Sequence, residues 1–387
     1  MSFIPYGRQT INEADIQAVV DVLKSDYLTQ GPVVPAFESA IASYCNVKHA
    51  VAANSATSAL HIACLALGVG KDDIVWTSPI TFVASANCAR YCGATIDFVD
   101  IDPISYNLCP KQLAIKLAQA KKIGCLPKVV IPVHFSGLPC DMANIYALSK
   151  EYGFRIIEDA SHAIGASYLT GKTGSCEYSD ITVFSFHPVK IITTAEGGLA
   201  TTQSQELAQK MQDFRSHGIT RDASRLHKQN EGAWYYEQQS LGFNYRMTEM
   251  QAALGLSQLN NLDAWISKRY ELADEYDEHL SMLPLILPNR SADSVSGLHL
   301  YVIQVDNQRT QLNRRQVFDA LRQAEIGVNV HYIPVHLQPD YQDLGFKLGQ
   351  FPLSERYYEQ CISIPMYAGL TNQQQATVIN TLVQIFS

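Results

Sequence analysis

Residues 184–198 read FSFHPVKIITTAEGG, and this stretch carries one lysine at a point where a buried strand should end. The apolar run Ile181–Phe186 leads into it, and Pro188 cannot donate to a central β-ladder, so the strand should stop before the lysine. Lys190 is therefore expected just beyond the carboxyl end of a strand, where open α/β sheets bind their ligands. Partly apolar surroundings weaken a lysine's preference for charge and make its amine a usable nucleophile. The competing interpretation is an ordinary surface lysine.

Composition sets the broad class of the protein. The chain has 387 residues, of which 47% are hydrophobic and 17% charged, as in a globular protein long enough for two domains. The net charge of −8 argues against a general nucleic-acid or membrane-surface binder. With no apolar leader and no run near the ~20 residues of a membrane span, we expect a cytoplasmic protein. The nine cysteines never occur as Cys-x-x-Cys, so we expect free thiols and no metal site.

From residue 49 the sequence alternates between short apolar runs and helical segments. We expect strands at residues 49–53, 74–77, 95–99, 128–133, 155–158 and 181–186, and helices at 59–67, 80–91, 110–120 and 142–152. Continuous apolar strands separated by helices indicate a mostly parallel sheet that is covered on both faces. The predicted fold class is therefore α/β.

The pattern differs at both ends of the chain. An N-terminal helix is expected over residues 11–25, with Asn12 as its N-cap and an apolar stripe of Ile16, Val19, Val20 and Leu23. After residue 202 we expect helices at 206–215, 246–259, 270–280 and 314–324, and strands at 297–305 and 327–331. This predicts a large domain over residues 10–260, a smaller α+β domain over 261–387, and an N-terminal arm, residues 1–9, near the active site. The long polar stretch 217–241 contains aromatic residues and is predicted to be functional.

Candidate partners for Lys190 follow other predicted strands. Asp159 ends the strand that begins at Arg155, 31 residues (190 − 159) before the lysine, so both should face one crevice. A lysine amine and a buried carboxylate are what pyridoxal phosphate (PLP) requires, because the amine forms a Schiff base and the carboxylate keeps the pyridine nitrogen protonated. Taken alone, Asp159 is more simply a helix N-cap.

A phosphate site and an aromatic wall complete the hypothesis. Residues Ser55-Ala56-Thr57 lie between a strand and a helix, so backbone N–H groups should point at an anion, and Ser185 can add a hydroxyl. Phe82 follows the next strand and could stack on a flat ring. Each feature also has a structural interpretation, as a simple N-cap or as a core residue.

Several segments together resemble the DegT/StrS group of sugar aminotransferases, and the resemblance covers nearly the whole chain. It is carried by residues NSATSAL 54–60, TFVA 81–84, EDASH 158–162, SFHPVK 185–190, EGG 196–198 and GFNYRM 242–247. It implies the PLP-dependent transferase fold type I, PLP as cofactor and a homodimer with shared active sites. Within the group, residues 187–190 and 234–238 look most like the C4 aminotransferases of pseudaminic acid synthesis.

The resemblance also implies roles for individual residues. Lys190 would bind the cofactor covalently and shuttle the proton, while Asp159 would pair with the pyridine nitrogen. The other residues at the cofactor would be Ala56, Thr57 and Ser185 at the phosphate, Phe82 and His162 at the ring, and Asn244 reaching the phosphate from the neighbouring subunit. A sugar pocket would be formed by Tyr6, Tyr235, Tyr236 and His331, although His331 could equally be a core histidine.

The expected reaction transfers an amino group from L-glutamate to the C4 ketone of a UDP-4-keto-6-deoxy-2-acetamido sugar. The alternative is an aminotransferase of the same group that acts on a dTDP-4-keto or 3-keto-6-deoxyhexose. A related dehydratase carries histidine in place of the lysine, a cofactor-binding regulator would need a DNA-reading domain, and a dinucleotide enzyme would need Gly-x-Gly-x-x-Gly; the sequence shows none of these. Ala195 departs from the usual glycine before Glu196 and would be strained if this position requires positive φ.

Overall fold

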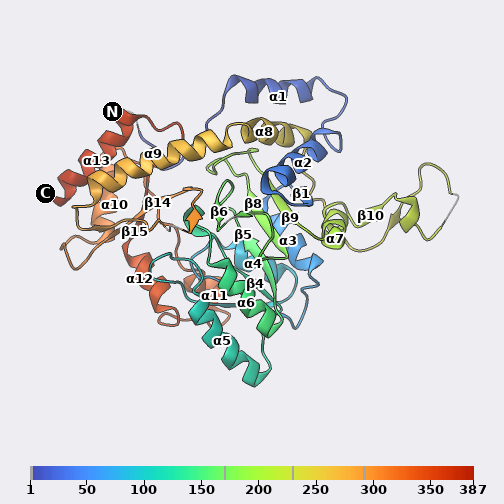
Figure 1. The fold of residues 1–387 in the computed structure, drawn as a ribbon, viewed down its shortest axis with the longest axis horizontal. Helices are drawn as coiled ribbons and strands as arrows, with labels where there is room; N and C mark the ends of the chain where they lie inside the picture. The colour runs from blue at the N-terminus through green and yellow to red at the C-terminus, as the bar shows by residue number, and fades with distance from the viewer. Residues whose placement is uncertain (1–2, 170, 229–230, 291–292) are drawn as a thin grey trace.

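A seven-stranded sheet forms the centre of the computed structural model, which describes residues 3–169, 171–228, 231–290 and 293–387 (Figure 1). The strand order is β1-β9-β8-β5-β4-β2-β3. The bounds are β1 His49–Ala53, β2 Ile74–Thr77, β3 Thr95–Phe98, β4 Val129–Ile131, β5 Arg155–Asp159, β8 Ile181–Ser185 and β9 Gly198–Thr202. Only β9 runs antiparallel to its neighbours in this sheet, so the predicted α/β class with a mostly parallel sheet is confirmed.

Helices cover both faces of this sheet because alternate strand residues point to opposite sides. On β4, Val129 and Ile131 pack with one helical layer, whereas Val130 packs with the other. The first layer contains α3 (Ala56–Ala66), α4 (Ala84–Tyr91) and α7 (Gln205–Arg215). The second contains α2 (Val33–Cys45), α5 (Pro110–Ile123), α6 (Met142–Tyr152) and α8 (Glu249–Leu259).

A second, three-stranded antiparallel sheet lies toward the end of the chain (Figure 1, left). It contains β12 (Leu285–Ile286), β14 (Tyr301–Val305) and β15 (Cys361–Ile364). Its core is shared with α9 (Leu262–Leu280), α10 (Arg314–Gln323) and α13 (Asn372–Phe386). The remaining elements are short or peripheral: β6 (Ser167–Tyr168), β7 (Gly171–Lys172), β13 (Ser294–Val295), α11 (Pro339–Gln342) and α12 (Pro352–Gln360). Among the helices of the described residues, none is both long and apolar enough to span a bilayer.

The N-terminal helix, α1 (Glu13–Leu23), is confirmed, but its predicted buried stripe is wrong. Asn12 caps the helix and forms a capping box with Asp15. Ile16 and Leu23 remain 48% and 56% exposed, whereas Asp15 is fully buried. Polar contacts hold this face of α1 against α8, because the Asp15 carboxylate accepts hydrogen bonds from Ser257 and Gln258 of α8, each at 2.6 Å.

Three other expectations near the cavity need correction. The helix expected from residue 80 begins at Ala84, which leaves residues 80–83 as a loop after β2. The strand expected at 327–331 is only an isolated bridge between Asn329 and Ser363. Strand β9, at residues 198–202, was not expected. In each case the local structure depends on contacts with segments that are distant in sequence. Strand β9, for example, pairs with both β1 and β8.

Candidate active site

A cavity of about 710 Å³ opens beyond the carboxyl ends of β5 and β8. Its walls come from the N-terminus of α3, the loop before α4, the turn after β8 and residues 329–333. Nine of the residues proposed from the sequence line it: Tyr6, Ala56, Thr57, Phe82, Asp159, His162, Ser185, Lys190 and His331. The topology thus brings together side chains that lie more than 300 positions apart in the chain.

Lys190 lies in the turn that follows β8, where its backbone N–H donates to the carbonyl of His187 at 2.9 Å. The side chain is partly exposed toward the cavity. Burial lowers the pKa of the lysine to about 8, and the nearby Asp159 carboxylate partly opposes this shift. About a tenth of the amine is therefore neutral at pH 7, far more than for an exposed lysine with a pKa of about 10.4, and a nucleophile or base must be neutral.

Asp159 is a buried carboxylate with fixed orientation. Ser85 at the start of α4 donates its hydroxyl to Oδ2 at 2.5 Å, and the backbone N–H of Ser161 donates to Oδ1 at 3.0 Å. Ser85 is itself held by Thr81 at 2.6 Å. These contacts fix the orientation of the carboxyl group, and Asp159 lines the cavity. The sequence did not identify Ser85 or Ser161 as partners.

The N-terminus of α3 forms an anion cradle. Ser55 caps the helix by accepting from the backbone N–H of Ser58 at 3.1 Å. The backbone N–H groups of Ala56 and Thr57 have no acceptor within the described part of the chain. Gly198 of β9 approaches so closely that a Cβ there would lie 2.4 Å from the nitrogen of Ala56. Free N–H groups and the positive end of the helix dipole favour a phosphate.

Phe82 supplies a flat apolar surface in the same cavity. Its ring is 59% exposed, and its neighbour is the ring of Tyr332 at 6.4 Å. An exposed aromatic face inside a cavity is typical of a site that binds a planar ligand. The amine, the carboxylate, the anion cradle and this ring together fit the four parts that hold PLP.

His162 and His331 are buried histidines at the cavity. His162 accepts from the backbone N–H of Ser136 at its Nδ1, and its Nε2 lies 3.1 Å from the hydroxyl of Tyr332. Burial lowers the pKa of His162 well below its usual value, with Lys190 and His331 adding to the shift. Burial and then Lys190 lower the pKa of His331 to about 3. Both imidazoles are therefore neutral at physiological pH.

Comparison with known proteins places this site in a family. The model of the DegT/DnrJ/EryC1/StrS aminotransferase family matches residues 9–383. The chain belongs to this family. The spore coat polysaccharide biosynthesis protein SpsC of Bacillus subtilis is 39% identical over 99% of this chain and 97% of its own length. The UDP-4-amino-4,6-dideoxy-N-acetyl-beta-L-altrosamine transaminase of Campylobacter jejuni is 38% identical with the same coverage.

Solved structures agree with this assignment. PseC of Helicobacter pylori, an aminotransferase of pseudaminic acid biosynthesis, has a TM-score of 0.90 and 31% identity over 100% of this chain and 99% of its own. A sugar aminotransferase of Streptococcus pneumoniae in its pyridoxamine phosphate (PMP) form has a TM-score of 0.90 and 30% identity, covering 99% of this chain and 98% of its own. The protein is therefore a PLP-dependent aminotransferase with the fold of the sugar aminotransferases.

The remaining side of the cavity of this aminotransferase is formed by Tyr6, His299 and residues 329–333. The rings of Tyr6 and His331 are 5.5 Å apart, and His331 is bonded to Ser363 at 2.7 Å. The rings of His299 and His162 are 4.4 Å apart. His299 and Tyr332 were missed, because nothing in their local sequence marks them as lying near a strand end.

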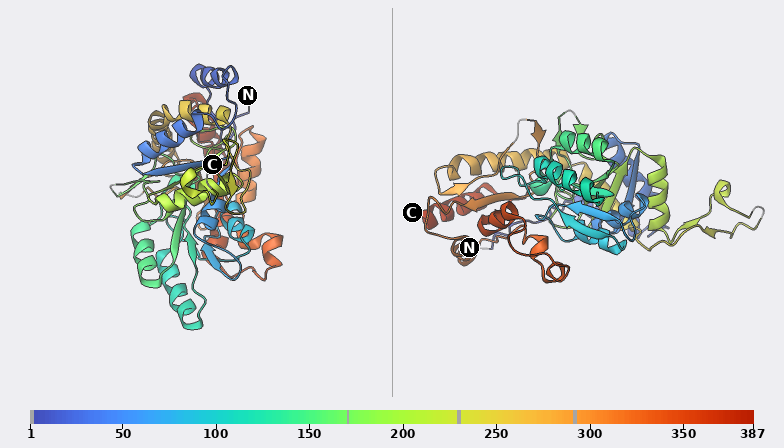
Figure 2. Two further views of the ribbon diagram at one scale, coloured as in Figure 1. Left: turned by 90° about the vertical axis from the view of Figure 1, so that its right-hand side faces the viewer. Right: turned by 90° about the horizontal axis from the view of Figure 1, so that it is seen from below.

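Three residues expected at the site do not line this cavity. Asn244 is exposed, and its backbone pairs with Ser216. Tyr235 and Tyr236 belong to the hairpin arm, residues 219–228 and 231–238, which contains β10 (Ile219–Thr220) and β11 (Glu237–Gln238). The hairpin arm projects away from the body of the protein (Figures 1 and 2). Their predicted place at a shared site remains a prediction about a second subunit.

Ala195 adopts a positive φ, the conformation that the sequence analysis identified as strained for an alanine. Its φ is 65°, in the left-handed region that glycine accepts without strain. Its backbone N–H donates to the hydroxyl of Thr193 at 3.0 Å, which holds the turn before Gly197 and Gly198. The aminotransferase thus keeps the turn geometry with an alanine in place.

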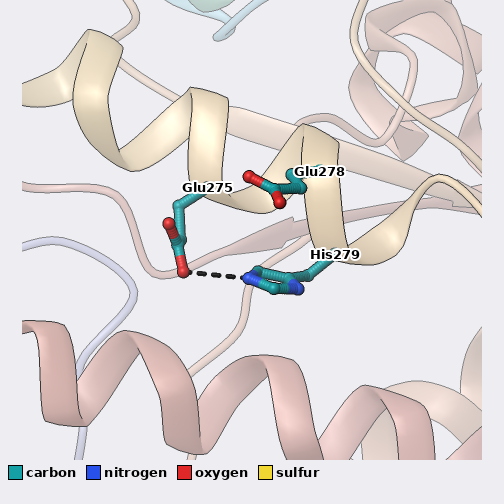
Figure 3. A group of neighbouring side chains, drawn as sticks. All are labelled: Glu275, Glu278 and His279. Carbon is teal, nitrogen blue, oxygen red and sulfur yellow. Dashed lines mark hydrogen bonds and ion pairs between the residues drawn. The ribbon is translucent and has the colours of Figure 1, made fainter.

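One group of side chains in the described residues has metal-ligand spacing, and it lies outside the cavity. Glu275, Glu278 and His279 are exposed on α9 (Figure 3). Glu275 and His279 form an ion pair at 3.0 Å, one helical turn apart. Exposed pairs of this kind are common on helix surfaces.

Proposed function

We propose that this aminotransferase transfers an amino group from L-glutamate to the C4 ketone of a UDP-4-keto-6-deoxy-2-acetamido sugar. The product would be the 4-amino sugar for pseudaminic acid biosynthesis. The observation that carries the proposal is the convergence of Lys190 and Asp159 in one cavity with an anion cradle. The activities of the Campylobacter and Helicobacter proteins support the choice of sugar.

The chemistry divides between cofactor and protein. PLP, when bound, supplies an electron sink for the negative charge that forms at the reacting carbon. Asp159, held by Ser85 and Ser161, would hold the proton of the pyridine nitrogen. Ala56 and Thr57 would bind the phosphate through backbone N–H groups, with Ser185 beside them. Phe82 would cover the ring.

Lys190 is the residue that would move the proton. It would take a proton from the α-carbon of glutamate and, in the second half-reaction, return one to C4 of the sugar. Both steps need an amine that changes protonation near neutral pH, and the pKa of about 8 meets this need. The neutral His162 and His331 beside it add no competing charge.

A homodimer would complete the site. Asn244 is exposed, and the hairpin arm carries Trp234 and Tyr236, which are 77% and 50% exposed. Exposed aromatic side chains on a projecting segment are costly unless another surface covers them. In a dimer, the hairpin arm of one copy would pack against the other copy and place Tyr235 and Tyr236 in its sugar pocket. Asn244 of the same copy would reach the phosphate site of the other.

The similarity to SpsC supports a second candidate substrate for the same type of reaction. It is 39% identical and is named for spore coat polysaccharide synthesis. This favours, as the alternative, transfer to another nucleotide sugar such as a dTDP-4-keto or 3-keto-6-deoxyhexose.

A panel of purified keto nucleotide sugars tests the proposal. The protein in its PMP form should be discharged fastest by the UDP-4-keto-6-deoxy-2-acetamido sugar, seen as a change in cofactor absorbance, and glutamate should restore the PMP form. The variant Lys190→Ala should show neither bound-cofactor absorbance nor turnover. Faster discharge by a dTDP-linked or 3-keto sugar would replace the proposal with its alternative.

A further inference from the structure

Tyr332 lies among the side chains assigned to the cofactor and those assigned to the sugar. Its ring is 6.4 Å from Phe82 and 6.1 Å from His162, and it stacks on the latter with an interplanar angle of 26°. It is also 4.9 Å from His331, whose ring lies beside Tyr6. The phenol therefore lies where an amino group would pass from cofactor to sugar.

The hydrogen bonds of His162 fix its tautomer. The backbone N–H of Ser136 can only donate, so Nδ1 of His162 must be the acceptor. The neutral ring has a single N–H, which must then be on Nε2. Nε2 therefore donates to the hydroxyl oxygen of Tyr332, 3.1 Å away.

This arrangement leaves the phenol proton of Tyr332 uncommitted. It cannot be given to His162, because Nε2 already carries a hydrogen. Within the part of the chain that the structure describes, the hydroxyl of Tyr332 makes no other hydrogen bond. Since Tyr332 lines the cavity, its proton is available to a ligand there. Burial, with Asp159 and Tyr6 adding to it, raises the pKa of the phenol, so the proton stays on the oxygen.

We propose that Tyr332 donates a hydrogen bond to the ketone oxygen of the amino-group acceptor, and that His162 is the positioning residue that orients it. The inference rests on the proposed function in one respect, that the acceptor is a sugar ketone. The carbon–nitrogen bond forms first. The carbon–oxygen bond then breaks, and the oxygen leaves as water with the two protons of the incoming amine. Negative charge builds on the oxygen during attack, and a preorganised neutral donor stabilises it. Tyr332 ends each cycle protonated.

Single-turnover measurements on the dimeric holoenzyme test this role. The variant Tyr332→Phe keeps the ring and loses only the hydroxyl, and Tyr152→Phe on α6 is the matched control. Amino transfer from the PMP form to the keto sugar should slow about 100-fold in Tyr332→Phe, the usual cost of removing one oxyanion donor. The control should match the unaltered protein.

Two further readouts separate this role from general damage to the site. The affinity for PLP and the resting absorbance spectrum should be unchanged in Tyr332→Phe, because the phenol contacts the acceptor. Calorimetry on the apoprotein should show that the unaltered chain prefers the keto sugar to its 4-deoxy analogue, and that Tyr332→Phe loses the preference. His162→Phe should reproduce the slow transfer, and His162→Gln, which keeps an N–H donor, should recover part of it.

The outcomes are distinguishable. A normal single-turnover rate in Tyr332→Phe, or an altered resting spectrum, overturns the role of Tyr332. If no keto nucleotide sugar discharges the PMP form of either protein, the proposed function fails. The same comparison with 2-oxoglutarate as acceptor then decides the role of Tyr332, because its ketone carbon must occupy the same position.

Discussion

The surroundings of Lys190 lower the pKa of its amine, and this has a measurable consequence in the apoprotein. Its amine should become reactive as pH rises through about 8, because burial lowers the pKa and the protonated form below that pH is not nucleophilic. Ordinary exposed lysines, with pKa near ~10.4, should become reactive about two pH units higher. Brief acetylation at a series of pH values, followed by peptide mass spectrometry, gives both curves. A midpoint for Lys190 above pH 10 would contradict the environment described here.

Ala195 makes a second prediction at the residue scale. Because a non-glycine residue in the left-handed region costs roughly 1–2 kcal/mol and glycine is freer when unfolded, Ala195→Gly should raise the free energy of unfolding by about 1 kcal/mol. Urea denaturation of the apoprotein measures this. Ala118→Gly, on the exposed face of α5, is the matched control and should instead destabilise by about 1 kcal/mol. A loss of stability in both variants would show that Ala195 is not strained in this turn.

The residues that sequence reasoning found share one property. Each of them lies at the end of a strand or just after it, and local signals such as Pro188 mark these ends: Lys190, Asp159 and the α3 N-terminus. Tyr332 and His299 come from the second half of the chain and reach the cavity only through packing between the two sheets. No local pattern reports such packing, and on this side of the cavity only Tyr6 and His331 were proposed, from the family resemblance.

At the scale of elements, the close approach of β9 to α3 is needed for the anion cradle. A Cβ at Gly198 would lie 2.4 Å from the nitrogen of Ala56, so Gly198→Ala should displace the α3 N-terminus. The affinity of the apoprotein for PLP, measured by fluorescence titration, should fall at least about tenfold, the loss of one hydrogen bond to a charged group. Gly70→Ala is the control, because a Cβ there meets nothing within 4 Å. Unchanged affinity in Gly198→Ala would remove β9 from the cradle.

Element boundaries were predictable where one signal dominated. Strands β1 and β2 and helix α6 lie where the sequence placed them, because each is bounded by turn residues or a cap. The loop at residues 80–83 was misread as helix. Its first apolar residue, Ile80, is buried in a cluster with Leu300 and Val302 near the second sheet, whereas Phe82 faces the cavity. The exposed stripe of α1 was misread as buried because Asp15, a polar residue, makes the contact with α8.

At the scale of the whole molecule, a single copy leaves surfaces that only a partner would explain. The hairpin arm projects from the body (Figure 2). The apolar side chains Ile16, Leu23, Tyr27 and Leu28, in and after α1, are about half exposed. The sequence predicted that the polar stretch 217–241 is functional from its aromatic residues and length, but it did not predict that the stretch projects as an arm. An isologous dimer would bury the same surface twice.

Mixing two inactive variants decides whether the active site is shared. Lys190→Ala removes the reactive amine, and Asn244→Ala removes the residue proposed to reach the partner's phosphate site. In a hybrid dimer with shared sites, one site carries both changes and the other carries neither, because each site takes its lysine from one copy and its asparagine from the other. Unfolding and refolding the two variants together should therefore restore about a quarter of normal activity, since half of the dimers are hybrids with one intact site each.

Each variant refolded alone is the control, and neither should gain activity. If Asn244 instead served its own chain, every site in the hybrid would lack one of the two residues and mixing would restore nothing. The same design applied to Lys190→Ala and Ser85→Ala gives the matched negative case, because Ser85 donates to Asp159 within one chain. Restoration of activity with Asn244→Ala but not with Ser85→Ala would show that Asn244 serves the site of the second copy.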